Sequence, residues 1–108
     1  MSARTIVPWP DKRLRTKAAP VEQITDETHS IWNDMIATME AMPGYGLAAP
    51  QLGILHRLAV VDCSSERGKA IRLANPRVIA RSDDMFEWSA ASPNLPGVSA
   101  KLVRPARV

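Results

Sequence analysis

Hydrophobic residues recur at helical spacing in one stretch of the chain, from Ile24 to Met42. Within it the apolar residues are three or four positions apart, which places them on one face of a helix: Ile31, Trp32, Met35, Ile36, Met39 and Met42. Thr25 or Asp26 supplies an N-cap oxygen, and Pro43-Gly44 stops the helix. The pattern therefore predicts one amphipathic helix over residues 24–42.

Short runs of aliphatic residues follow the helix and predict strands. Leu58–Asp62 and Ile71–Asn75 are separated by a polar turn at Ser64–Gly68, and Val78–Arg81 is a third such run. The last stretch, Ser92–Val108, alternates apolar and polar residues but contains three prolines, so at best it forms an irregular edge strand. A helix followed by antiparallel strands predicts an α+β fold.

Length and composition fit one small globular domain. The chain has 108 residues, of which 45% are hydrophobic and 23% are charged, so we predict a single folded domain over residues 1–108 rather than a disordered chain. The longest aliphatic run, Leu58–Val61, is far too short to cross a membrane. The single cysteine, Cys63, cannot form an intramolecular disulfide, which favours a reducing compartment. We therefore expect a cytoplasmic protein without a membrane partner.

The net charge of +3 is concentrated near the N-terminus. Residues 1–17 carry five Lys and Arg residues against one Asp, so the rest of the chain is nearly neutral. Three prolines in residues 1–20 predict an extended arm that wraps the domain. This basic arm leaves open an association with RNA or the ribosome. Because no aromatic interleaving, zinc spacing or helix-turn-helix pattern accompanies it, we do not expect a nucleic-acid partner.

The segment Gly44–Gln51 reads Gly-Tyr-Gly-Leu-Ala-Ala-Pro-Gln and has the most unusual local composition in the chain. Its two glycines allow the backbone to take positive φ and to approach a ligand closely. A Gly-x-Gly pair is also common in ordinary turns, and no third glycine opens a helix here as a dinucleotide site requires. From these residues alone, a binding loop and a plain turn both remain possible.

The whole octapeptide resembles the first signature motif of peptide deformylases, metal hydrolases that remove the formyl group from the initiator methionine of new bacterial proteins. Pro10–Arg15, Arg57–Asp62, Asn75-Pro76 and Leu95–Ala100 are similar to further segments of that family, in the same order along the chain. The resemblance covers essentially all 108 residues. It implies a truncated version of the family's α+β fold.

The resemblance also implies roles for residues of the octapeptide. The side-chain amide of Gln51 would donate to the formyl oxygen as negative charge develops there. The backbone around Gly44, Tyr45, Gly46 and Leu47 would bind an extended peptide, as a strand adds to a sheet edge. Tyr45 stands where the family usually has a smaller aliphatic residue. From the residues alone, Gln51 can equally be a buried amide that ties down its own loop.

The second family motif, Glu-Gly-Cys-Leu-Ser, supplies a thiolate ligand to the metal, and this chain departs from it. The corresponding stretch, Glu87–Asn94, contains no cysteine. Alignment on Leu95-Pro96 puts Ser92 at the ligand position, where a hydroxyl is a weak ligand beside a thiolate. Cys63 does not replace it, because this cysteine comes at the end of a predicted strand and is expected to be an ordinary strand-end residue.

The third family motif, a helical His-Glu-x-x-His, is absent. His29 and His56 are 27 residues apart, and neither is followed by Glu-x-x-His, so both are expected to be ordinary surface or hydrogen-bonded histidines. The resemblance reaches only the strand after the second motif, so the metal-binding helix is missing from these 108 residues. The family uses Fe²⁺, Ni²⁺ or Zn²⁺, and we expect no metal cofactor in this chain. A longer version would still have an unusual site, such as two histidines with water.

Three functions remain open from the sequence. The first is a peptide deformylase homologue that is weak or inactive as this chain. The second is a non-catalytic module that binds formyl-methionyl or methionine-leading N-termini, including those of nascent chains, and the third is the RNA-associated arm. Loss of the metal-binding helix would also leave the apolar face of Met35, Ile36 and Met39 short of partners, so we expect self-association or a partner chain over it.

Overall fold

The computed structural model describes residues 3–97 and 99–108. Val98, in the expected edge strand, and the first two residues of the expected arm therefore lie outside the described residues. The chain divides into two compact units, Met1–Pro76 and Arg77–Val108, and each is described by itself. The expectation of a single domain over residues 1–108 stays a prediction.

The first unit contains the predicted helix, α1, which spans Asp26–Ala41. Thr25 is its N-cap: the Thr25 hydroxyl accepts from the amide of Thr28 at 3.3 Å, and the Thr25 amide donates to the Thr28 hydroxyl at 3.1 Å. This reciprocal pair provides hydrogen-bond acceptors for the backbone amides of Thr25 and Thr28 at the start of the helix. The helix prediction is confirmed, with Thr25 rather than Asp26 as the cap. Among the described residues no helix is both long and apolar enough to cross a bilayer.

Three short strands of the first unit form an antiparallel sheet with the order β1-β2-β3. They span Gly46–Ala48 (β1), Leu58–Val61 (β2) and Ile71–Ala74 (β3). In this register Leu47 lies opposite Val60. The predicted strands at 58–62 and 71–75 and the α+β fold are confirmed. Because β2 lies in the middle, β1 is an edge strand whose backbone pairs within the sheet on one side only.

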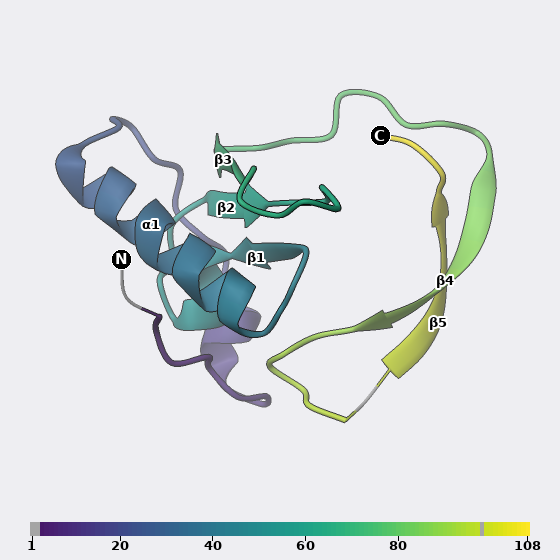
Figure 1. The fold of residues 1–108 in the computed structure, drawn as a ribbon, viewed down its shortest axis with the longest axis horizontal. Helices are drawn as coiled ribbons and strands as arrows, with labels where there is room; N and C mark the ends of the chain where they lie inside the picture. The colour runs from purple at the N-terminus through teal and green to yellow at the C-terminus, as the bar shows by residue number, and fades with distance from the viewer. Residues whose placement is uncertain (1–2, 98) are drawn as a thin grey trace. The chain divides into compact units, whose positions relative to one another are not determined.

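The helix packs across β1 and β2, as Figure 1 shows for the first unit. Met35, Met39 and Val60 have 0% exposure and form the centre of the core. The other buried apolar residues of this cluster come from α1, from the two strands and from the segment after β1: Ile31, Trp32, Ile36, Leu47, Ala49, Leu52 and Leu58. The indole nitrogen of Trp32 donates to the carbonyl of Leu73 at 3.2 Å, which ties α1 to β3 as well.

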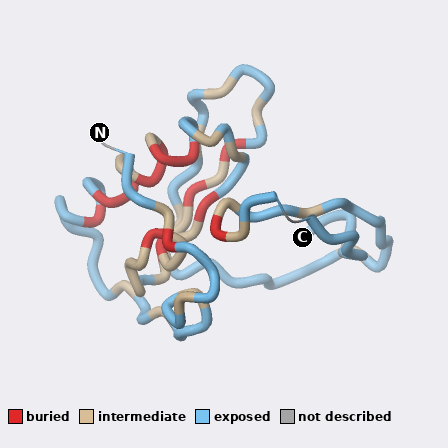
Figure 2. The backbone as a smooth tube through the Cα atoms, turned by 90° about the horizontal axis from the view of Figure 1, so that it is seen from below, coloured by how far each residue is buried: buried red, intermediate tan, exposed pale blue. Residues whose placement is uncertain are grey.

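This packing overturns the expectation that the apolar face of α1 lacks partners. Met35, Ile36 and Met39 are all buried by the strands of their own unit, and Figure 2 shows the buried backbone gathered on α1 and the strands beside it. Leu47 and Val60 supply the covering side chains, because their strands place them on the face of the sheet that meets the helix. The reason we gave for self-association over this face is therefore removed.

The N-terminal residues form the expected arm along the first unit. The amide of Val7 donates to the carbonyl of Gln51 at 2.9 Å, and Ala19 exchanges backbone hydrogen bonds with Leu55 and Arg57, each at 2.9 Å. A short 3-10 turn, Lys12–Leu14, interrupts the arm. The prediction of an extended arm is confirmed for the described residues, and the arm passes directly beside Gln51.

The second unit is a hairpin of two antiparallel strands, β4 (Met85–Ala91) and β5 (Ser99–Pro105). The expected strand at Val78–Arg81 is wrong. Val78 and Ile79 are 69% and 85% exposed, so their side chains lack the burial that would favour a strand there. β4 was not predicted, and β5 is a regular strand rather than an irregular one. Cross-strand pairs such as Trp88 with Leu102 hold the two strands together, which a reading of one segment at a time does not reveal.

The loop between β2 and β3 is closed by the buried carboxylate of Asp62. It accepts from the amide of Ser64 at 3.0 Å, from the hydroxyl of Ser64 and from the amide of Lys69 at 3.1 Å. The Ser64 hydroxyl lowers the pKa of Asp62 most; both amides and the charge of Arg67 add to this, while burial opposes it. The ionised carboxylate therefore favours the folded loop.

Acid should weaken this loop. Because the pKa of Asp62 is lower in the folded chain than its ordinary value of 3.8, its stabilising effect is complete above that value and is lost as the pH falls through the lower, folded-state pKa. We expect Asp62→Asn to lower the free energy of unfolding at pH 7 and to reduce its further loss in acid. Urea unfolding at pH 7 and pH 3 measures both effects. Asp83→Asn, at an exposed position, is the control, and equal acid sensitivity of wild type and Asp62→Asn would contradict the account.

Gly53 should be the glycine that the fold tolerates least as alanine. It ends the 3-10 turn η2 (Ala49–Leu52) with φ 78°, and a Cβ there would lie 2.5 Å from Nη1 of Arg13 and 3.2 Å from Cγ2 of Val7. Gly68 has a similar φ of 74° but nothing within 4 Å of such a Cβ. We expect Gly68→Ala to cost about 1–2 kcal/mol from backbone strain alone, and Gly53→Ala to cost more. Urea unfolding of both variants checks the order, and equal costs would show that the Arg13 and Val7 side chains move aside.

Candidate functional site

The segment Gly44–Gln51 runs from the end of α1 through β1 into η2. The carbonyl of Tyr45 accepts from the amide of Asp62 at 2.8 Å, and Gly46 pairs with Val61, so the segment is fixed to β2 along one side. Leu47 is 3% exposed and points into the core, whereas the side chain of Tyr45 is 69% exposed. The structure thus brings the four expected peptide-binding residues together at the edge of the sheet.

The two glycines of the segment do not adopt the positive φ that glycine allows. Among the described residues the glycines with positive φ are Gly53, Gly68 and Gly97, so the expectation of positive φ at Gly44 and Gly46 is wrong. A Cβ on Gly44 would lie 3.3 Å from Cε of Met42, so this glycine lets the segment pack closely on the end of the helix.

Gly46 differs from Gly44 because the fold itself has room for a side chain there. A Cβ at this position would lie 3.5 Å from the carbonyl oxygen of Val60, which is an ordinary contact. The residue is exposed on the edge strand. Because Gly46 has no side chain, the backbone of β1 stays accessible at this position. Close approach of a ligand is the second property that the sequence predicted for this glycine.

Gln51 lies half-buried in η2, three residues after β1 ends. Its side-chain carbonyl oxygen accepts from the amide of Ala48 at 2.9 Å, and its own backbone carbonyl accepts from Val7. The side chain therefore ties down its own loop, as one of the two interpretations proposed. Holding the amide oxygen also fixes the plane of the group whose nitrogen carries the donor hydrogens. The donor role itself stays a prediction.

Arg67, in the β2–β3 loop, also contacts this segment and was missed by the sequence reasoning. One guanidinium nitrogen donates to the carbonyl of Asp62 at 2.9 Å, and the other donates to the carbonyl of Gly44. The guanidinium carbon lies 5.6 Å from the centre of the Tyr45 ring, within the range of a cation–π contact. No pattern in the turn Ser64–Gly68 indicates the contacts with Gly44 and Tyr45, because they join positions more than twenty residues apart.

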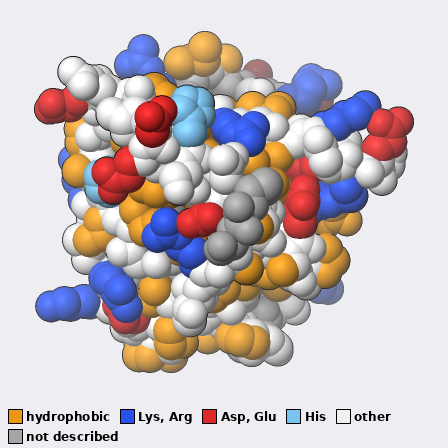
Figure 3. Space-filling model, turned by 60° about the vertical axis from the view of Figure 1, so that its left-hand side comes forward, with side chains coloured by type: hydrophobic (Ala, Val, Ile, Leu, Met, Phe, Trp, Pro, Cys, Tyr) orange, Lys and Arg blue, Asp and Glu red, His pale blue; other side chains and the backbone are white. Residues whose placement is uncertain are grey.

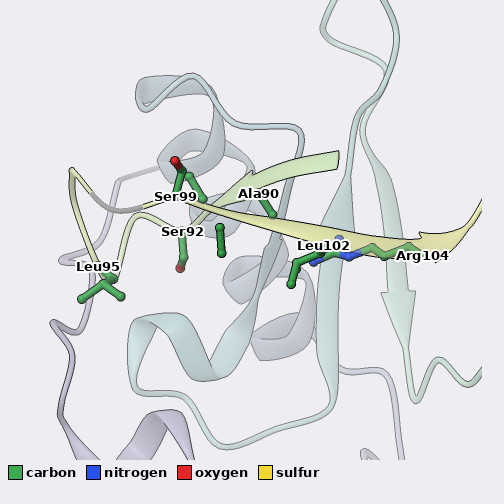
Figure 4. A pocket seen from close by; sticks show the side chains of 8 residues that line it. Ala90, Ser92, Leu95, Ser99, Leu102 and Arg104 are labelled. Atoms are coloured by element: carbon green, nitrogen blue, oxygen red, sulfur yellow. The ribbon is translucent and has the colours of Figure 1, made fainter. Parts of the chain in front are cut away.

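Ser92, at the position of the missing thiolate, lies in the second unit just after β4. Its hydroxyl oxygen is 3.3 Å from Oδ1 of Asn94 and accepts from the Asn94 amide at 3.4 Å. It lines a hollow of about 260 Å³ with apolar side chains such as Leu95 and Leu102 and with Arg104, as Figure 4 shows. The hydroxyl therefore stabilises the turn between β4 and β5, and the described residues that line this hollow include no acidic or imidazole side chain.

The two histidines and the cysteine are spread over the first unit. His29 packs edge-to-face against Trp32, with ring centres 5.4 Å apart, and His56 forms an isolated backbone bridge with Ala19. Cys63 is exposed just after β2. Within residues 3–97 and 99–108, no three His, Cys, Asp or Glu side chains are grouped so that they could hold a metal ion. The described residues do not fit the metal that the resemblance implies.

The basic arm pairs part of its charge with carboxylates of its own unit. Arg4 contacts Asp34 and Arg13 contacts Asp11, each at 2.9 Å, and the Arg13 side chain holds the pKa of Asp11 at about 2. Acidic and basic side chains intermingle on the face shown in Figure 3. These pairs reduce the net positive charge that the arm would present to a polyanion.

Comparison with known sequences shows the family to which the chain belongs. The polypeptide deformylase family matches residues 3–108. The peptide deformylase of Hydrogenovibrio crunogenus is 38% identical over 108 residues, which are all of this chain and 63% of that protein. That of Chromohalobacter salexigens is 39% identical over 108 residues, again all of this chain and 64% of the relative. The chain thus spans less than two thirds of the length of these relatives.

Solved structures give the same result. A peptide deformylase from Legionella pneumophila superposes with a TM-score of 0.90 at 35% identity. The match covers 96% of this chain and 61% of the Legionella chain. The peptide deformylase of Ehrlichia chaffeensis in complex with actinonin superposes with a TM-score of 0.89 at 31% identity, covering 97% and 64%. With the family matched from residue 3 to residue 108, this chain belongs to the polypeptide deformylase family.

Proposed function

We propose that this chain is a peptide deformylase homologue that binds formyl-methionyl peptides along β1 and does not hydrolyse them as these 108 residues. The observation that carries the proposal is the position of β1: it is an edge strand, and the oriented amide of Gln51 follows three residues after its end. The peptide deformylases to which the chain is similar support the choice of substrate. A nascent chain in the cytoplasm is the partner and compartment that this function predicts.

An extended peptide fits β1 as an added strand. The outer side of an edge strand presents backbone donors and acceptors that can pair with a second backbone. The absent side chain of Gly46 lets that backbone approach, and burial of Leu47 anchors the strand from behind. Tyr45, exposed just before the strand, lies at one end of the proposed binding edge.

Gln51 gives this surface its chemical preference. Its amide oxygen is held by Ala48, so the plane of the amide is set before any ligand arrives. A donor that is already oriented loses little freedom when it binds a carbonyl oxygen. We infer that the formyl oxygen is the acceptor, which makes the formylated peptide bind more tightly than the same peptide with a free amine.

Hydrolysis needs more than this surface supplies. Attack on the formyl carbon requires an activated water, and the described residues contain no grouped ligands for a metal that would activate it. The Ser92 hydroxyl is engaged with Asn94 in the turn after β4. We therefore derive no hydrolytic step for this chain.

A non-catalytic binding module is the second candidate function. The observation that favours it is that Gly44, Gly46, Leu47 and Gln51 all lie within the first compact unit. Binding along β1 would then be the function itself rather than the remnant of a catalytic site. Both candidates use the same edge of β1, and neither predicts turnover by these 108 residues.

The purified chain should hold Fe, Ni and Zn at less than one equivalent and should release no formate from a formyl-methionyl peptide. The physical reason is the donor set, in which Ser92 replaces a thiolate and no His-Glu-x-x-His is present. Elemental analysis and a formate-release assay measure the two quantities. A peptide deformylase such as that of Legionella pneumophila is the positive control, and stoichiometric metal with turnover in this chain would contradict the proposal.

The formyl preference should depend on Gln51. Gln51→Ala removes the donor and should weaken binding of the formylated peptide by roughly 2- to 13-fold, the cost of one neutral hydrogen bond, while the unformylated peptide is nearly unaffected. Gln51→Glu keeps an oxygen for the Ala48 amide but replaces the donor, so it should lose the formyl preference with the loop still held. Calorimetry with both peptides gives the four affinity changes.

Two results separate a donor from a structural amide. If Gln51→Glu binds both peptides as the wild type does and Gln51→Ala weakens both alike, then Gln51 only holds its loop. Gly46→Val is the matched control for the binding edge of β1. Its side chain should block the approach of either peptide backbone and weaken the binding of both peptides equally. The fold has room for a Cβ at this position, and thermal unfolding checks that the variant stays folded.

A further inference from the structure

Arg67 links the β2–β3 loop to the segment that precedes β1. Its guanidinium donates to the carbonyls of Gly44 and Asp62 and lies against the ring of Tyr45. Asp62 in turn donates its amide to the carbonyl of Tyr45 at 2.8 Å. The Arg67 side chain therefore contacts Gly44 and Tyr45, which lead into β1. It also contacts Asp62, which follows β2 and pairs with Tyr45.

These contacts add to the backbone hydrogen bonds that hold Gly44 and Tyr45. Gly44 follows the end of α1, where carbonyl groups lack helical partners, and its amide donates back to Met39 at 2.7 Å. The Tyr45 side chain is 69% exposed, so burial cannot fix its position. The forked guanidinium can bind a carbonyl and cover a ring at the same time, which a lysine cannot do with equal geometry.

The backbone of Arg67 shows that the surrounding loop enforces this placement. Its φ is 64°, and among the described residues only Asn75 is another non-glycine with positive φ. Asparagine adopts this region readily, whereas a long side chain such as arginine does so at a cost and only where its surroundings fix it. Here the Arg67 amide donates to the hydroxyl of Ser64 at 3.1 Å, and that hydroxyl is held by the buried Asp62 carboxylate.

We propose that Arg67 is a positioning residue for peptide binding: it holds Gly44 and Tyr45 so that the edge of β1 stays in the conformation that pairs with an extended peptide. This inference rests on the proposed function. Because Arg67 acts through the backbone of the segment and not on the formyl group, its loss changes the affinity for formylated and unformylated peptides by the same factor. Gln51, by contrast, changes the ratio between them.

The test compares Arg67→Gln with Lys69→Gln, which removes the same charge from the same loop. The side chain of Lys69 pairs with Glu66 at 2.7 Å on the surface, away from the Gly44 carbonyl. We expect Arg67→Gln to weaken both peptides by a common factor of roughly 2- to 13-fold for each hydrogen bond that it loses, and Lys69→Gln to leave both unchanged. Arg67→Lys, which keeps the charge over Tyr45, should fall between them.

Two further measurements distinguish positioning from simple support of the fold. The backbone amide signals of Tyr45 and Gly46 in NMR spectra of the free protein should shift in Arg67→Gln and not in Lys69→Gln. Arg67→Gly adopts a positive φ without steric penalty, so it keeps the loop conformation while removing the guanidinium, and it should weaken both peptides as Arg67→Gln does.

Each outcome decides the proposal. Folded Arg67→Gln and Arg67→Gly that bind both peptides with wild-type affinity would overturn it, even if their unfolding temperatures fall, and so would a loss confined to the formylated peptide. If the wild-type chain binds neither peptide, the proposed function fails and this inference fails with it. Wild-type binding with unchanged Arg67 variants removes the role of Arg67 alone.

Discussion

Burial of the apolar face of α1 against β1 and β2 is the constraint on which the rest of the first unit depends. Met35, Met39 and Val60 are completely buried, and Leu47 joins them from β1. Since side chains alternate along a strand, placing Leu47 in the core puts its neighbour Gly46 on the opposite, exposed face. The same packing leaves β1 at the edge of the sheet. The proposed peptide-binding edge of β1 is thus a consequence of how the helix packs against the sheet.

Three sets of hydrogen bonds then hold the segment Gly44–Gln51, which contains β1. Gln51 accepts from the Ala48 amide and fixes the loop after β1, while Val7 of the arm fixes the backbone of Gln51. Arg67, in the loop between β2 and β3, holds the residues before β1 and is supported by Asp62 and Ser64 of the same loop. A rigid edge strand flanked by oriented polar groups is suited to binding an extended backbone, because little freedom remains to be lost when the peptide binds.

Structural elements that follow from the local spacing of hydrophobic residues could be predicted from the sequence. Elements and contacts that depend on residues far apart in the chain could not. The spacing of Ile31, Met35 and Met39 predicted α1, because one helical face is a local pattern. Val78–Arg81 has the composition of a strand but stays exposed, whereas β4 owes its conformation to pairing with β5. The octapeptide indicated the candidate site through family resemblance. The positive φ that its glycines allow is not adopted, and the contacts of Arg67 with Gly44 and Tyr45 were missed because these partners lie more than twenty residues away in the sequence.

The central claim is that the β1 edge keeps a working peptide-binding surface, and an NMR titration of the isotope-labelled chain with a formyl-methionyl peptide tests it most directly. Backbone amide signals report the contact residue by residue, whether or not the peptide is cleaved. The account predicts saturable shifts that are largest for the amides of Gly44, Tyr45, Gly46, Leu47 and Gln51. Saturable binding that leaves these amides unmoved, or no binding at all, would contradict it.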